Sequence, residues 1–148
     1  MTSDTQQPRI AVAVAIRDES GDFLAVKRPR EDTVLGSVWG LPAIYVEPGE
    51  ALEKAAIRVG RQKLGVEVEP VRRIGEDQAE RSDFTLRLTV FEARIVAGAP
   101  SVPQTDPTIT QYIDLKYTSD PGLLVEAARR GSVCSRVFLG ERGVSWSI

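Results

Sequence analysis

The chain has 148 residues, of which 42% are hydrophobic and 27% charged, a composition typical of one globular domain. Its 19 basic and 21 acidic side chains give a formal charge of -2, so neither specific nucleic-acid binding nor membrane binding is expected. The absence of histidine excludes histidine bases and histidine-ligated metals, and the single cysteine, Cys134, excludes an internal disulfide. Any chemistry must therefore use carboxylates, lysine, arginine, hydroxyls or backbone groups, with a metal held only by oxygen ligands.

The two ends of the chain differ in character. Residues 1–8 are polar and predict a flexible tail, whereas residues 9–148 predict a single domain. The N-terminus lacks the apolar stretch of a secretory signal, and no apolar run is long enough to cross a membrane. Together with the lone cysteine, these features predict a cytoplasmic protein.

The first half of the domain predicts strands followed by a helix. The apolar run Ile10–Ile16 is typical of a strand buried on both faces, and Phe23–Lys27 predicts a second strand. The polar turn between them favours a hairpin. A short extended piece is expected at 43–46. Apolar residues at helical spacing then predict a helix from Ala51 to Leu64, ended by Gly65.

The second half predicts more strands and a helical end. Strands are expected at 66–74, 84–95 and 111–117, with a charged connection at 75–83 between the first two. A helix is expected at 121–130, followed by a short helical turn at 132–139. Strands, a helix, more strands and a terminal helix indicate an α/β protein whose mixed sheet carries helices on its faces.

The most informative segment is residues 39–66, which read WGLPAIYVEPGEALEKAAIRVGRQKLGV. This segment resembles the Nudix box of the Nudix hydrolase superfamily. Glu50 and Arg58 keep the family's spacing of seven intervening residues, and the Leu-Pro and Glu-Pro-Gly-Glu approach is also present. The resemblance covers roughly residues 8–117 and implies a Nudix-type α/β/α sandwich with a mixed β-sheet.

The resemblance also implies a chemistry. In the family, glutamates on the box helix bind magnesium, which holds a pyrophosphate and activates water. The implied substrate is a small phosphorylated molecule, such as a nucleoside diphosphate linked to another group, and family members are in some cases homodimers. Helix positions 59, 62 and 63, where the family has its glutamates, are expected within one turn of each other.

This chain departs from the family pattern at those positions. Val59, Gln62 and Lys63 stand where the three helical glutamates are expected, Gly60 replaces an apolar residue, and Ile44 replaces the box glycine. A valine offers no ligand to a hard cation and a lysine ammonium repels one. The magnesium that the family implies therefore has no assigned ligand here, and the cofactor is left unknown.

Three hypotheses follow. The first is a Nudix-family hydrolase-like protein for a nucleoside-diphosphate-linked or related molecule, with weak or altered metal-dependent hydrolysis of the pyrophosphate. The alternative is a catalytically inactive binding or sensor module for a nucleotide or other anionic ligand. A third is a metal-independent enzyme in which Glu50 acts as acid or base.

The candidate residues each have a functional and a structural interpretation. Glu50 is the candidate catalytic residue, but it can equally begin the helix or pair with Arg58. Arg58 can contact substrate or brace the loop as an ion-pair partner. Lys63 can attract a phosphate directly or remain a solvated lysine. Arg28 can bind a phosphate or lie on the surface, and Tyr45 can stack on a base or belong to the core.

An acidic set in the predicted connection provides one further hypothesis. These residues could substitute for the missing metal ligands, although a charged run is more often a solvated connection. The set comprises Glu76, Asp77, Glu80 and Asp83.

Overall fold

The computed structural model describes residues 8–30, 35–102 and 112–146. Most of the predicted N-terminal tail and the expected strand start at Gln111 lie outside these ranges. In chain order the elements are β1 (Arg9–Ile16), β2 (Phe23–Lys27), β3 (Trp39–Gly40), β4 (Ala43–Tyr45), α1 (Leu52–Val59), the π-helical turn η1 (Gly60–Leu64), β5 (Glu67–Glu80), β6 (Thr85–Ala97), β7 (Asp114–Thr118), the 3-10 turn η2 (Pro121–Leu124), α2 (Val125–Arg129) and α3 (Val133–Glu141).

The strands form two sheets. One has the order β4-β1-β6-β5 and is mixed, because β1 runs parallel to β6 while the other pairs are antiparallel. The other, β3-β2-β7, is antiparallel. The predicted hairpin is confirmed only at its turn, where Arg17 and Phe23 form one antiparallel bridge, because β1 and β2 then pair in different sheets. After β1 the Asp18 carboxylate accepts the backbone N–H groups of Ser20 and Asp22, and this tight turn carries the chain from one sheet to the other.

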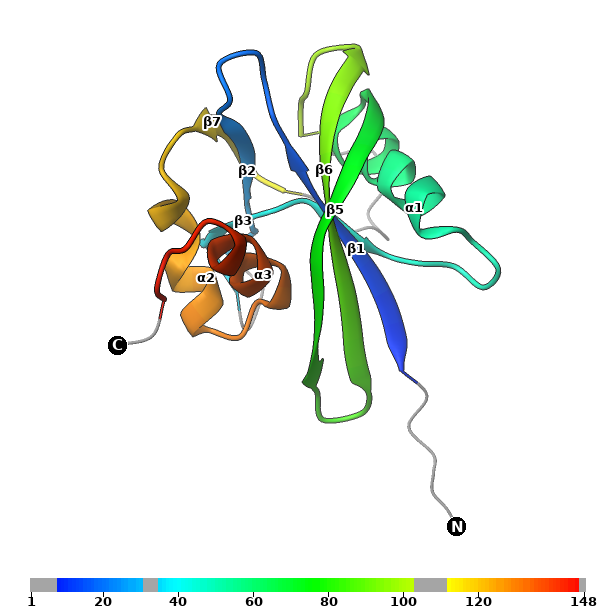
Figure 1. Ribbon diagram of the computed structural model, residues 1–148, viewed down its shortest axis with the longest axis vertical. Helices are drawn as coiled ribbons and strands as arrows, with labels where there is room; N and C mark the ends of the chain where they lie inside the picture. Colours follow the sequence, from blue (N-terminus) through cyan, green and yellow to red (C-terminus); the bar gives the residue numbers. More distant parts are fainter. Residues whose placement is uncertain (1–7, 31–34, 103–111, 147–148) are drawn as a thin grey trace.

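Strand β1 explains why helices cover both faces of the mixed sheet. Successive side chains of a strand point to opposite faces. The small residues Ala11, Ala13 and Ala15 belong to the core that includes α2 and α3, whereas the valines and isoleucine between them pack with α1. Figure 1 shows α1 on one side of the sheet and α2 and α3 on the other. The predicted α/β/α sandwich with a mixed sheet is confirmed.

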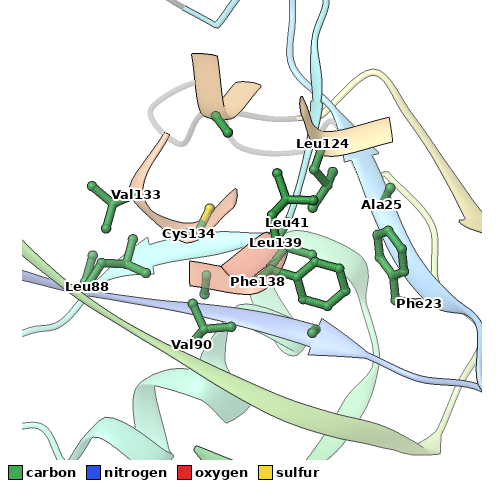
Figure 2. Packing of buried hydrophobic residues seen from close by; sticks show 14 of the residues in the cluster. Phe23, Ala25, Leu41, Leu88, Val90, Leu124, Val133, Cys134, Phe138 and Leu139 are labelled. Carbon is green, nitrogen blue, oxygen red and sulfur yellow. The ribbon is translucent and has the colours of Figure 1, made fainter. Parts of the chain in front are cut away.

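The C-terminal helices complete one half of the core. Phe138 on α3 is fully buried, and its ring centroid lies 4.6 Å from that of Phe23 on β2 at an interplanar angle of 53°. Leu124 and Leu139 pack in the same cluster, as Figure 2 shows. Burying side chains of this size contributes roughly 1.5–3 kcal/mol each. Much of this half of the core therefore comes from the last thirty residues or so.

The expected connection at 75–83 is wrong, because β5 continues to Glu80 and forms a long hairpin with β6. Pairing with β6 satisfies the backbone groups, so the exposed side chains can be charged. Three register shifts interrupt the pairing of β5 with β6, between Glu67 and Val68, between Pro70 and Arg72 and between Arg73 and Gly75. A Cβ atom at Gly75 would come within 3.2 Å of Val137, so glycine allows β5 to pass close to α3.

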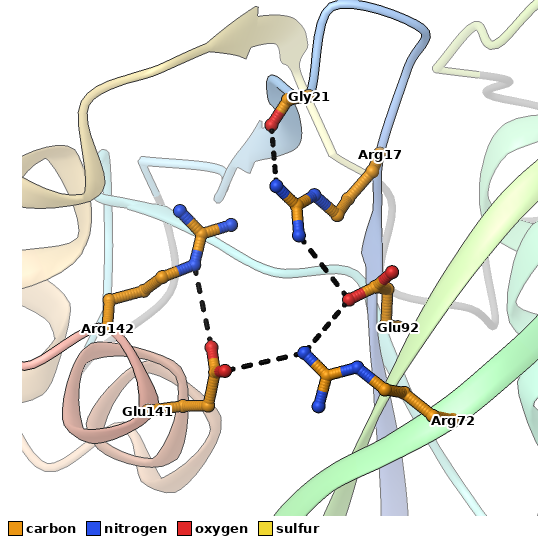
Figure 3. Close-up of polar contacts among 6 residues, drawn as sticks. All are labelled: Arg17, Gly21, Arg72, Glu92, Glu141 and Arg142. Carbon is orange, nitrogen blue, oxygen red and sulfur yellow. Dashed lines mark hydrogen bonds and ion pairs between the residues drawn. The ribbon is translucent and has the colours of Figure 1, made fainter.

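A chain of ion pairs joins α3 to the mixed sheet (Figure 3). Arg72 on β5 lies between two carboxylates, 3.1 Å from Glu92 on β6 and 3.3 Å from Glu141 on α3. Glu92 also pairs with Arg17 at 3.5 Å. Such partly exposed pairs contribute at most about 1 kcal/mol each. Their role is to fix how α3 sits on β5 and β6, while the apolar core supplies most of the stability.

Candidate functional site

A cleft of about 690 Å³ is lined by residues of β1, β4 and β6 in the mixed sheet, by the loop after β4 and by the end of the α1–η1 helix. Four of the sequence-predicted residues line it together: Arg28, Tyr45, Arg58 and Lys63. They come from three parts of the chain: the end of β2, β4, and the α1–η1 helix, which carries both Arg58 and Lys63. Glu50 lines an adjoining hollow of about 450 Å³, which shares Tyr45 with the cleft.

Glu50 and Arg58 form a bidentate ion pair that braces the loop before α1. The Arg58 Nε donates to Glu50 Oε2 and its Nη2 donates to Glu50 Oε1, both at 2.9 Å. The same Nη2 donates to the carbonyl of Tyr45 at 2.8 Å, and the backbone N–H of Glu47 donates to Glu50 Oε1. The Arg58 hydrogen bonds hold the pKa of Glu50 below its usual value. The bracing interpretation of Arg58 thus matches its contacts.

The helix that carries the box widens into a π-helical turn at Gly60. A Cβ atom there would lie 2.9 Å from a Val68 methyl group and 3.1 Å from the Val66 carbonyl, so the turn packs closely on β5. The Gly60 carbonyl accepts the N–H groups of Gly65 and Val66, and Gly65 has a φ of 70°, which suits glycine. Single π-helical turns are rare and occur often at functional sites.

The three positions that were expected to share one face of the helix lie in different surroundings. Val59 is fully buried in the core on the α1 side, Gln62 is exposed at the cleft, and Lys63 is 7% exposed and lines the cleft. The expectation that positions 59, 62 and 63 project together does not hold for Val59, because it packs against the sheet.

Lys63 is a buried cation among other cations. Its Nζ lies 5.5 Å from the ring centroid of Tyr112, and the Arg28 guanidinium lies 6.0 Å from the same ring. Burial, helped by the positive charges of Arg28 and Arg58, lowers the pKa of Lys63 to about 8. At neutral pH the lysine is therefore still mainly protonated.

Tyr112 was missed by the sequence reasoning, although it forms part of the cleft wall. It is 2% exposed, and its hydroxyl accepts the backbone N–H of Ala43 at 3.0 Å, which ties it to β4. Burial raises its pKa, so the hydroxyl stays neutral. Its only signal in the sequence was an aromatic residue at the start of an expected strand.

Tyr45 lines both the cleft and the adjoining hollow. The guanidinium of Arg9 lies 3.9 Å from the centroid of its ring, and the side chain is 44% exposed. One face of the ring is therefore covered by a cation, so an aromatic ligand would have to use the other face.

The described residues do not fit a divalent cation of the kind that the family resemblance implies. Within the described ranges, no three His, Cys, Asp or Glu side chains lie close enough together to hold a metal ion. The acidic residues of the hairpin, Glu76, Asp77, Glu80 and Asp83, are exposed and form no such group. What the cleft offers instead is three cationic side chains and one carboxylate, that of Glu47.

The described part of the chain has no helix that is both long enough and apolar enough to cross a membrane.

Comparisons with known proteins agree with this architecture. The family model of the NUDIX domain matches residues 7–114. The MutT protein of Methanosarcina mazei Go1 is 21% identical over 95% of this chain and 97% of its own, with a TM-score of 0.68. The E. coli ORF135 protein is 21% identical over 93% and 92%, with a TM-score of 0.69. A MutT NUDIX hydrolase from Burkholderia pseudomallei is 24% identical over 76% and 83%, with a TM-score of 0.63. No curated protein matches.

The fold and the braced loop before the box helix define an α/β/α domain with an open, positively charged cleft. The family match spans most of the chain, and the chain belongs to the NUDIX domain family.

Proposed function

We propose that this NUDIX-family protein binds a nucleoside-diphosphate-linked or related phosphorylated small molecule in the cleft, and hydrolyses its pyrophosphate weakly or by an altered route. The observation that carries the proposal is the convergence of Arg28, Arg58 and Lys63 on one cleft. Ligand phosphates carry negative charge, and cationic side chains that are partly shielded from water attract it strongly.

The proposed roles follow from the contacts. Arg28 and Lys63 bind phosphate oxygens, since both line the cleft beside Tyr112. Tyr45 offers its uncovered ring face to a base. Arg58 holds the loop and adds its positive charge. Glu50 is the proposed catalytic base. Its carboxylate is ionised at neutral pH, but the hydrogen bonds from Arg58 that lower its pKa also make it a weaker proton acceptor, which agrees with slow hydrolysis.

The exchange of helical carboxylates for Val59, Gln62 and Lys63 supports weak rather than ordinary hydrolysis. Without those carboxylates the chain has no oxygen ligands at the positions that the family uses for magnesium. The alternative, an inactive binding or sensor module, is favoured by the same buried ammonium, since Lys63 favours an anion and disfavours a metal-activated water.

Two measurements test the proposal. Titration calorimetry with ADP and inorganic pyrophosphate should show binding that weakens about tenfold or more in Lys63→Met and in Arg28→Met. Lys54→Met, an exposed lysine on α1, is the matched control and should bind as the wild type does. If neither ADP nor inorganic pyrophosphate binds to the wild-type protein, the proposed function is refuted.

Product analysis then separates hydrolysis from binding. With ADP-ribose, assayed in parallel with magnesium and with EDTA, we expect slow phosphoanhydride cleavage that is lost in Glu50→Gln. Turnover of about one per second or faster would contradict weak hydrolysis. Binding with no product after long incubation would support the sensor module instead.

Three wider expectations remain predictions. Residues 9–148 are proposed as one folding domain, since α2 and α3 complete the core that begins on β1 and β2. A cytoplasmic location and a homodimer are likewise proposed. Sedimentation of the full chain tests the homodimer.

A further inference from the structure

The cleft is unusual in having a cation built into its wall. Lys63 is 7% exposed, so its ammonium is held by the fold and is not a freely moving surface group. It projects from η1, whose π-helical hydrogen bonds fix the direction of this residue. Arg28 lines the cleft from the end of β2, and its guanidinium lies over the same tyrosine ring as the Lys63 ammonium.

Among the residues that the structure describes, two carboxylates line the cleft and the adjoining hollow, those of Glu47 and Glu50. Glu50 is paired in a bidentate manner with Arg58, so its charge is largely neutralised within the wall. Glu47 lines the cleft but is exposed, and water screens it. A hard divalent cation that entered here would meet the Lys63 ammonium and the Arg28 guanidinium, which both lie over the Tyr112 ring. A phosphate would meet the same groups as donors of charge-assisted hydrogen bonds.

We infer that the cleft selects the metal-free form of a diphosphate, with the Lys63 ammonium supplying the positive charge that a bound cation would otherwise supply. The inference rests on the proposed function, because it describes the state in which that function's ligand is bound. Magnesium is then an antagonist of binding. It reduces the charge of the ligand and brings a second cation towards Lys63 and Arg28.

The test measures ADP binding by titration calorimetry in two buffers of equal ionic strength. One contains EDTA, and the other contains about 10 mM magnesium chloride, balanced with sodium chloride so that general screening is the same. We expect affinity for ADP to be about tenfold or more higher in EDTA. Equal affinity in the two buffers, or higher affinity with magnesium, would overturn the inference and leave the proposed function standing. Absence of ADP binding in both buffers would overturn the proposed function as well.

Variants assign the effect to the built-in cation. Lys63→Gln should bind ADP more weakly in EDTA and should lose most of the magnesium antagonism, and Lys63→Glu should reverse it, so that magnesium aids binding. Lys54→Gln is the control and should keep the full antagonism, because Lys54 is exposed on the outer side of α1. Circular dichroism melting shows that each variant is folded before titration. If folded Lys63→Gln kept the full antagonism, the inference would be wrong.

Discussion

Replacing Lys63 with methionine should stabilise the protein at neutral pH and change its stability little near pH 10.5. The unfolded chain holds the Lys63 proton with a pKa of about 10.5, whereas in the fold the value is about 8. Between these values the unfolded state binds more protons than the native state, so stability rises with pH across the window. Below pH 8 the whole cost of keeping a buried ammonium is present, and above pH 10.5 it is gone.

The size of the effect follows from the same two values. A pKa difference between 10.5 and about 8 corresponds to about 3 kcal/mol of free energy of unfolding at pH 7. Methionine has a similar length and no charge, so Lys63→Met should gain up to that amount at pH 7 and less than about 0.5 kcal/mol at pH 10.5. Urea unfolding at both pH values measures it, with Lys54→Met as the exposed control. A Lys63→Met variant that is less stable than the wild type, by the same amount at both pH values, would refute the buried-charge reasoning.

Three further predictions concern the same region. Gly60→Ala should lower the free energy of unfolding by about 1–3 kcal/mol, because its Cβ would press on Val68 and the Val66 carbonyl. Gly140→Ala on α3 is the control and should not destabilise, because its Cβ would meet nothing within 4 Å. Thermal denaturation compares the two variants, and equal effects would argue against the close packing of η1. Glu50→Gln should cost about 1–2 kcal/mol by weakening the bonds from Arg58, and an unchanged melting temperature would show that the loop needs no brace. ADP affinity should fall as pH rises through about 8, because Lys63 loses its proton there, and calorimetry from pH 7 to 9.5 should show no such fall in Lys63→Met.

The features that could be predicted from sequence are those with a local or periodic cause. The apolar run Ile10–Ile16 predicts a strand buried on both faces, and this run forms most of β1. The spacing of Glu50 and Arg58 predicts a loop before a helix, and these two side chains form the ion pair that braces it. Both the sandwich and the grouping of the four substrate-binding candidates on one cleft follow from such signals.

Other features depend on partners that are distant in sequence. The stretch 75–80 looked like a connection because it is charged, yet β6 satisfies its backbone groups and solvent accepts its side chains. The hairpin of β1 and β2 does not extend beyond the single bridge of Arg17 and Phe23, because the longer pairing partners of both strands lie later in the chain. Tyr112 lies in the cleft wall, where its hydroxyl accepts the backbone N–H of Ala43, a contact that no spacing rule indicates.

The π-helical turn at Gly60–Leu64 has a consequence for how this chain can change over generations. Because such a turn holds one more residue than an α-helical turn, it is equivalent to a one-residue insertion in a helix. Deleting the single codon of the exposed Arg61 would let the helix close in the ordinary α-helical way and would bring Lys63 one position closer to Gly60. The direction of the Lys63 side chain, and with it the position of the positive charge in the cleft wall, would therefore change without any substitution of Lys63.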